Sequence, residues 1–251
     1  MKLSPGDSTE NTVKVAIINF SGNVGKTTVA RQLLAPRLRA PAFCIESLNA
    51  SDGDEAGETE RMRGREFGDL QEELMLLDSA IVDIGASNVE DVIRLMGQFE
   101  GSHEEFDYFV VPTVSERKQQ IDTIHTIETL AGLGVPPSRI RLLFNKVEMG
   151  DGQAIAERFS ALLGFHAAHA CFRLRLDAAL FRNEIFERLR VLNKSVAEVA
   201  ADTTDYRAQL RDLEDPEGRA HAVSMISVQR LARSAQRNLD AAYLALFEDA
   251  S

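Results

Sequence analysis

The chain has 251 residues, of which 44% are hydrophobic and 27% are charged. These proportions are typical of soluble globular proteins and exclude the collagen-like, low-complexity and wholly disordered classes. No apolar run approaches the roughly 20 residues that cross a bilayer. The polar start of the chain, residues 1–12, lacks the apolar centre of a signal peptide.

Cysteine content and net charge indicate a location and limit the partners. Cys44 and Cys171 cannot form a disulfide framework, and the sequence contains no Cys-x-x-Cys metal pair, so we expect a cytoplasmic protein. The net charge is −11. An acidic chain binds DNA poorly as a whole, so any contact with DNA needs a local basic patch.

Five short apolar segments have the composition of strands that are covered on both faces. They are rich in β-branched residues and nearly continuous in apolar character, which is the pattern of parallel sheets. Helical patterns separate them, and this alternation predicts right-handed crossovers. We therefore expect an α/β fold, with a mostly parallel central sheet and helices on both faces. The predicted strands are 14–19, 42–45, 79–84, 108–114 and 140–147.

Helices are predicted between the strands at 27–34, 88–99, 116–131 and 153–163. Pro36 is expected to end the first helix, and Ser87 and Glu90 have the spacing of a capping box for the second. The third is expected to bury an apolar face and to stop at Gly132 and Gly134. Its predicted inward residues are Ile121, Ile124, Ile127 or Glu128, and Ala131. Those of the fourth helix are Ile155, Phe159 and Leu162.

Two parts of the chain depart from this alternation. Residues 46–73 hold ten acidic residues and three arginines, and we interpret them as a solvated, loop-rich stretch. From about residue 178 no strand pattern is present, so helices are expected, with a turn at 215–218. A long helix is predicted at 222–247 because apolar residues recur there at three- and four-residue spacing. These are Met225, Val228, Ala232, Ala235, Leu239, Ala242 and Leu246.

The first predicted strand runs directly into a glycine-containing loop, Phe20-Ser21-Gly22-Asn23-Val24-Gly25-Lys26-Thr27-Thr28, and a helix follows. Gly22 and Gly25 can expose backbone N–H groups to a phosphate, Lys26 supplies a cation, and Thr27 offers a hydroxyl to Mg²⁺. The strict phosphate-loop pattern fails, because Phe20 stands where its first glycine is required. The flanking strand and helix still favour nucleotide binding. The remaining loop residues expected in the site are Asn23, Val24 and Thr28.

Two further strand ends carry polar residues that suit a nucleotide site. Asp83 ends a buried strand, where it can hold a Mg²⁺-bound water and accept a hydrogen bond from the hydroxyl of Thr27. The alternative interpretation is an aspartate that caps a helix or forms a turn. The amide of Asn145 donates and accepts at once, as adenine recognition requires; the alternative is a turn asparagine. Guanine-reading loops have Asn-Lys-x-Asp, and Glu148 replaces that aspartate here, so adenine is favoured over guanine.

Residues 21–28 resemble the loop of the ParA/MinD family of deviant phosphate-loop ATPases, Lys-Gly-Gly-Val-Gly-Lys-Thr-Thr. The similarity covers about residues 13–195 and is strongest to plasmid stabilisation proteins of the StbB type. It implies a parallel-sheet fold, binding of ATP and Mg²⁺ with Lys26 and Asp83 in the catalytic site, and an ATP-dependent dimer. It also implies a plasmid-encoded DNA-binding partner and a role in plasmid stability, positioning or conjugative transfer. The stretches that carry it are 46–50, 82–88, 110–112 with 118–119, and 143–147.

The chain departs from the family pattern at positions that serve hydrolysis. Ser21 stands where the family has a lysine that reaches the partner's phosphates, and only Glu46 matches the family's Asp-x-Asp. A cation acting across a dimer is worth about 10³ to 10⁵ in rate, so we expect weak or partner-dependent ATP hydrolysis. A pseudo-ATPase scaffold and a dethiobiotin-synthetase-like ligase remain alternatives. Candidate substitutes for the missing groups are Asn49, Asp52 and Asp54 for the carboxylate and Lys118, otherwise a solvated lysine, for the cation.

The expected organisation is a polar tail at 1–12, a phosphate-loop NTPase domain at 13–195 and a helical extension at 196–251 packed on that domain. On the last helix, Arg230, Arg233 and Arg237 share one face. This face is interpreted either as a solvated arginine surface or as a contact for DNA phosphates or an acidic partner.

Overall fold

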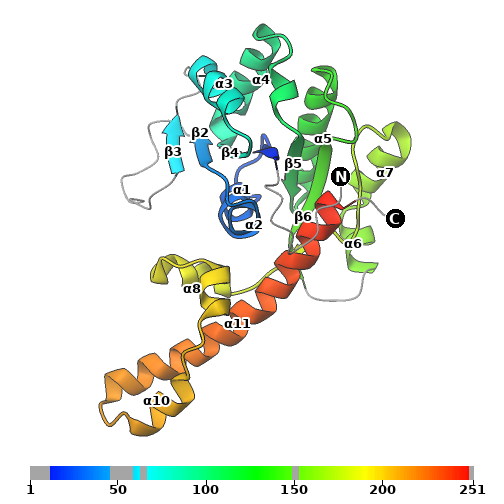
Figure 1. Cartoon of the computed structure of the whole chain (residues 1–251). Helices are drawn as coiled ribbons and strands as arrows, with labels where there is room; N and C mark the ends of the chain where they lie inside the picture. Colours follow the sequence, from blue (N-terminus) through cyan, green and yellow to red (C-terminus); the bar gives the residue numbers. More distant parts are fainter. Residues whose placement is uncertain (1–11, 46–58, 63–66, 149–152, 249–251) are drawn as a thin grey trace.

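The computed structural model describes residues 12–45, 59–62, 67–148 and 153–248, and a seven-stranded sheet lies at its centre (Figure 1). The strand order is β3-β2-β4-β1-β5-β6-β7, and each of these pairings is parallel. The expected α/β class is confirmed. The strands are β1 (Lys14–Ile17), β2 (Ala42–Ile45), β3 (Thr59–Met62), β4 (Ala80–Ile84), β5 (Tyr108–Thr113), β6 (Ile140–Val147) and β7 (Ala179–Phe181).

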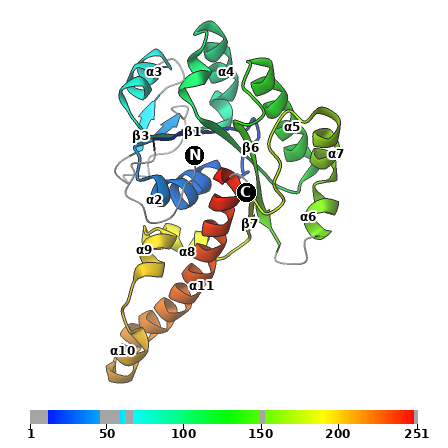
Figure 2. The same cartoon turned by 45° about the vertical axis from the view of Figure 1, so that its right-hand side comes forward.

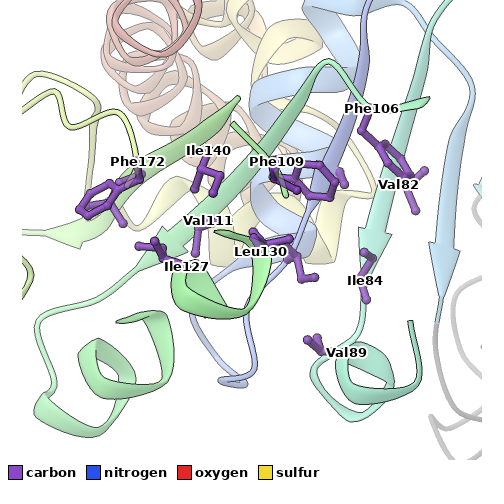
Figure 3. Packing of buried hydrophobic residues seen from close by; sticks show 14 of the residues in the cluster. Val82, Ile84, Val89, Phe106, Phe109, Val111, Ile127, Leu130, Ile140 and Phe172 are labelled. Atoms are coloured by element: carbon purple, nitrogen blue, oxygen red, sulfur yellow. The ribbon is translucent and has the colours of Figure 1, made fainter. Parts of the chain in front are cut away.

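One face of the sheet packs against five helices, and this layer contains most of the large aromatic residues of the core. Val82 of β4 and Phe109 of β5 belong to this layer together with Ile127 and Leu130 of α5 (Figure 3). Each fully buried side chain of this size contributes about 1.5–3 kcal/mol relative to an exposed one. The helices are α3 (Phe67–Leu76), α4 (Val89–Gln98), α5 (Arg117–Gly132), α6 (Gln153–Arg158) and α7 (Ser160–His169).

The opposite face is covered by the helix that follows β1 and by C-terminal helices (Figure 2). Successive residues of a strand point to opposite faces, so Val15 and Ile17 of β1 face this layer, whereas Ala16 faces the other. The elements on this side are α1 (Lys26–Thr28), the π-helix Val29–Leu34, α2 (Ala35–Leu38), α8 (Ile185–Leu192), α9 (Val196–Ala201) and part of α11 (Pro216–Phe247).

The last helix, α11, joins the sheet to a projecting arm. Its C-terminal half packs on the sheet, and its N-terminal half extends away with α10 (Tyr206–Asp212) beside it (Figures 1 and 2). At the root, Arg37 of α2 donates to Asp240 of α11 at 2.6 Å and lies over the ring of Tyr243. Gln32 of the π-helix accepts from the backbone N–H of Val196 in α9 at 2.8 Å. The helix that follows the phosphate loop is therefore bonded to two C-terminal helices.

The predicted apolar stripe of α11 is confirmed, since all seven of its residues are buried. The predicted turn at 215–218 is wrong. Asp215 caps the helix by accepting from the N–H of Gly218 at 2.5 Å, and Pro216 occupies the first turn, where a missing N–H is tolerated. The division of the chain at residue 195 stays a prediction. In the described residues, none of the helices combines the length and apolar composition needed to cross a membrane.

Two segments contain regular structure that the sequence did not predict. The loop expected at 46–73 includes the edge strand β3, which pairs with β2, and the start of α3, which buries Phe67, Leu70 and Leu74. The C-terminal region expected to be helical begins with β7, which pairs with β6. β7 has three residues, so its apolar run is too short to distinguish from a helical segment by periodicity.

Three predictions about helix ends are corrected by local hydrogen bonding. Pro36 does not end the first helix: Ala35 donates to the carbonyl of Ala30 to close the π-helix, and Pro36 then falls in the first turn of α2. The capping box is absent, because Ser87 lies within the 3₁₀ turn Ala86–Asn88 and Asn88 is the N-cap residue of α4. The fourth predicted helix is two helices that meet at Phe159, although its three inward residues are buried as expected.

Candidate functional site

The loop between β1 and α1 has the backbone conformation of an anion cradle. Asn23 (φ 60°) and Gly25 (φ 87°) are both left-handed, and helical geometry begins at Lys26. Alternation of this kind turns successive N–H groups toward one side and creates a concave anion site at a helix N-terminus. A side chain added at Gly22 would meet nothing within 4 Å. The space above the loop is therefore open at that position.

Lys26 lies under this loop rather than in solvent. Its ammonium group donates to the carbonyls of Asn19 and Ser21, each at 3.0 Å, and the residue is 8% exposed. Burial lowers the pKa of Lys26 from 10.5 to about 8, and the carboxylate of Asp83 partly opposes this shift. A buried ammonium group has lost most of its hydration, so a phosphate anion nearby stabilises its charged form. This favours phosphate binding at Lys26.

The two predicted Mg²⁺ residues differ in exposure. Thr27 is exposed in the first turn of α1, whereas Asp83 is 5% exposed near the carboxyl end of β4. In the sheet register Asp83 lies opposite Ile17, the last residue of β1, and opposite Cys44 of β2. The aspartate is thus at the sheet edge from which the phosphate loop leaves, and its charge is coupled to that of Lys26.

The start of the loop is anchored to α5 by threonines. The side-chain amide of Asn19 donates to the carbonyl of Pro112 at 2.9 Å and to the hydroxyl of Thr123 at 2.8 Å. Its oxygen accepts from the N–H of Ser21 at 2.7 Å. The N–H of Phe20 donates to the hydroxyl of Thr126 at 3.2 Å. The loop is consequently held in one conformation by a helix more than a hundred residues away.

This anchoring explains why the predicted inward face of α5 is partly wrong. Ile121 is 55% exposed, whereas Thr123 and Thr126 are fully buried. Both hydroxyls also donate to the carbonyl four residues earlier, at 2.6 and 2.7 Å, so they are satisfied without solvent. The signal that sequence reasoning missed is a pair of hydroxyls at i and i+3 on a helix that otherwise offers apolar residues. The buried residues are Gln120, Thr123, Thr126, Ile127 and Leu130.

The end of the loop is anchored to β6. The amide of Asn145 donates to the carbonyl of Val24 at 2.7 Å, and Lys146 donates to the carbonyl of Asn23 at 2.8 Å. A Cβ atom at Gly25 would overlap the amide nitrogen of Asn145. The structure therefore brings Asn145 against the loop, as a residue that fixes loop geometry. The neighbouring Glu148 pairs with Arg182 at 3.1 Å, both side chains being largely exposed.

The remaining candidates are placed as follows. Ser21 is 5% exposed, and Val24 is 1% exposed. Thr28 is half-buried in α1, and Lys118 is exposed near the start of α5. The candidate carboxylates at 46–54 lie outside the described residues. The structure thus brings together the loop, Lys26, Thr27, Asp83 and Asn145, and adds the Asn19 and threonine anchors that the sequence did not reveal.

Comparisons with known proteins reveal a shared fold. No family model matches the sequence, and no curated protein matches it. The MinD cell division protein of Aquifex aeolicus is 11% identical, with a TM-score of 0.51, and the match covers 95% of this chain and 99% of that chain. At this identity the likeness establishes the fold: the chain has the phosphate-loop α/β fold of MinD.

Two other solved structures belong to the same group of ParA/MinD-family ATPases. Apo McdA of Cyanothece is 15% identical, with a TM-score of 0.49 over 84% of this chain and 99% of that chain. MinD of Pyrococcus horikoshii, complexed with Mg-ADP, is 11% identical, with a TM-score of 0.49 over 92% of this chain and 94% of that chain.

Proposed function

We propose that the chain is a ParA/MinD-type nucleotide switch that binds ATP with Mg²⁺. The observation that carries this proposal is the buried ammonium group of Lys26 beneath a left-handed loop at the start of a helix. Two positive features converge there, the lysine charge and the helix N-terminus, and both favour a polyanion. The open space at Gly22 leaves room for the phosphates.

Each proposed ligand contact falls to a residue of the described site. The backbone N–H groups of residues 22–28 and the ammonium of Lys26 bind the phosphates, and Thr27 and Asp83 hold Mg²⁺ directly or through water. When bound, Mg-ATP supplies the phosphoanhydride whose cleavage resets the switch. Burial lowers the pKa of Lys26 to about 8, and Asp83 limits this fall because a neighbouring carboxylate favours the charged form.

We propose adenine as the base. Guanine-reading loops use an aspartate after the Asn-Lys pair, and the residue here, Glu148, is engaged with Arg182. Asn145 contributes by holding the loop through Val24, and its second amide hydrogen and remaining oxygen lone pair can face a base.

Hydrolysis is proposed to be weak or dependent on a partner. Ser21 brings no cation to a facing subunit, and it is buried in the loop. The proposed assembly is a nucleotide-dependent homodimer in the cytoplasm that works with a plasmid-encoded DNA-binding protein. The resemblance to StbB supports plasmid stability, positioning or conjugative transfer as the process served. Ser21 equally favours a second candidate, a scaffold that binds ATP without hydrolysing it.

Titration calorimetry with Mg-ATP and Mg-GTP tests the binding proposal. We expect wild type to bind Mg-ATP more tightly than Mg-GTP, and Lys26→Ala and Thr27→Ala to weaken binding strongly. Lys194→Ala, which removes an exposed lysine that follows the end of α8, is the matched control. Wild-type affinity in Lys26→Ala would contradict the phosphate-loop assignment.

Turnover measurements separate the candidate functions. A basal ATPase rate that a partner raises supports the switch, binding without turnover supports the scaffold, and turnover that needs a small acid supports a ligase. Ser21→Lys restores the family's cation and is expected to raise the rate of a dimer. An unchanged rate in a Ser21→Lys protein that still dimerises would indicate that Phe20 and Asn23 have given the loop another role.

A further inference from the structure

The projecting arm contains a groove far from the nucleotide site. It lies between α10, the segment before it and the N-terminal half of α11, and its volume is about 270 Å³. Figure 1 shows α10 beside the distal end of α11, away from the sheet. The residues that line it are Thr203, Thr204, Asp205, Tyr206, Arg207, Ile226, Gln229, Arg230 and Arg233.

Three arginines give the groove its charge. Arg207, Arg230 and Arg233 are exposed, and within the described part of the chain none of their guanidinium groups makes an ion pair or hydrogen bond. By contrast, Arg37 is paired with the carboxylate of Asp240, and Arg175 with that of Asp177. The arginines of the groove thus differ from these in lacking a counter-ion.

Asp205, which lines the groove, and Asp202, which lies in the segment before α10, accept hydrogen bonds from neutral groups. Asp205 caps α10 by accepting from the N–H groups of Arg207 and Ala208 at 3.0 and 2.9 Å. Asp202 accepts from the N–H of Thr204 at 2.9 Å and the hydroxyl of Tyr206 at 3.0 Å, and hydrogen bonding lowers the pKa of Asp202. Both carboxylates keep their charge, but neither forms an ion pair with Arg207, Arg230 or Arg233, so the three guanidinium groups are open to a carboxylate or phosphate from outside.

The groove is formed before any ligand arrives. Gln229 of α11 is 7% exposed, and its amide donates to the carbonyls of Asp202 and Thr204 at 3.1 and 3.2 Å. These bonds fix the segment before α10 against α11. Ile226 and Tyr206 add apolar surface to the same groove. A preorganised site avoids the cost of ordering its walls on binding.

We propose that this groove binds an acidic peptide segment of a partner protein. Arginine forks pair with carboxylates through two hydrogen bonds, and the apolar wall fits the aliphatic part of glutamate or a neighbouring apolar side chain. A DNA duplex fits less well, because its phosphates lie along a wide convex surface that cannot enter a groove of about 270 Å³. The arginine set expected from the sequence was Arg230, Arg233 and Arg237. The groove contains Arg230 and Arg233 together with Arg207, whereas Arg237 is not among its lining residues.

Fluorescence polarisation with the full chain tests this proposal. The probe is a short labelled peptide rich in glutamate with a single leucine; the comparison probes are the same peptide with glutamine for glutamate and a short DNA duplex. We expect wild type to bind the glutamate peptide but neither the glutamine peptide nor the duplex. The affinity for the glutamate peptide should fall as the salt concentration is raised. Arg230→Gln with Arg233→Gln should weaken binding by about three- to tenfold for each arginine.

Matched variants keep the result interpretable. Arg158→Gln with Arg190→Gln removes the same charge from exposed positions outside the groove and should leave the affinity unchanged. Arg230→Lys with Arg233→Lys keeps the charge but loses the planar fork, and should bind at an intermediate affinity. Circular dichroism checks that each variant retains its helices. Equal peptide affinity in the Arg230/Arg233 glutamine variant, no peptide binding by wild type, or tighter binding of the duplex through these arginines would each overturn the proposal.

Discussion

Replacing Gly25 with alanine tests the contact between the loop and β6. The backbone there is left-handed (φ 87°), which costs an L-residue about 1–2 kcal/mol. The new methyl group would also overlap the amide of Asn145, which must then release the carbonyl of Val24. A lost hydrogen bond of this kind costs about 1 kcal/mol. We therefore expect Gly25→Ala to lower the free energy of unfolding by about 2–3 kcal/mol.

A double-mutant cycle separates these two contributions. Asn145→Ala alone loses the bond to Val24 and should cost about 1 kcal/mol. With Asn145 shortened, Gly25→Ala retains the backbone strain but has nothing to overlap. The double variant should therefore be more stable than the sum of the single changes predicts, by about 1 kcal/mol.

Equilibrium urea unfolding followed by circular dichroism supplies the four free energies. Gly22→Ala is the control, because an added Cβ there meets nothing within 4 Å, and its stability should match wild type. Additive costs in the cycle, or a Gly25→Ala protein as stable as wild type, would refute the proposed contact between Asn145 and the loop.

Three other predictions concern a charge, an anchor and a cap. Because the pKa of Lys26 is lowered to about 8, calorimetry should find Mg-ATP affinity level below that pH and falling above it by up to about tenfold per pH unit; Lys26→Arg should remove the pH dependence. The same shift means that the unfolded chain holds this proton more tightly, so the contribution of Lys26 to the free energy of unfolding should rise between pH 8 and 10.5. Thr123→Val removes the hydroxyl that accepts from Asn19 and should weaken Mg-ATP binding in calorimetry, whereas Thr123→Ser keeps a hydroxyl and should bind as wild type does. Equal affinities of the valine and serine variants would contradict a positioning role for Thr123. Asp215→Ala removes the N-cap of α11 and should lower the free energy of urea unfolding by about 0.5–2 kcal/mol, with Asp212→Ala as an exposed control that leaves it unchanged.

The sequence was sufficient for the centre of the fold because buried parallel strands leave a simple signal. β6 was predicted at its observed bounds, since both of its faces are covered and its apolar run is nearly continuous. β7 and β3 lie at the two edges of the sheet, where a short strand is stabilised by its neighbour more than by its own composition. That information is not present in a local window of sequence.

The candidate site residues were chosen from local signals, a contiguous loop and two strand ends, whereas the anchors of the loop depend on tertiary contacts. Gly25, Lys26 and Thr27 follow one another in the chain, so their spacing indicated a phosphate loop. Thr123 meets Asn19 across 104 positions, and a buried threonine on a helix cannot be distinguished by spacing from a solvent-exposed one.

The attachment of α11 gives the arm the geometry of a lever. Its 32 residues, at about 1.5 Å each, make a rod about 48 Å long, and the root of this rod is clamped by Arg37 to the helix that begins at the phosphate loop. From Asp240 to Pro216 this helix is about 36 Å long, so a tilt of about 5° at the clamp displaces its far end by about 3 Å, about the length of a hydrogen bond. A change too small to detect beside the phosphates is therefore large enough at the tip to align a bound partner or to move it out of reach.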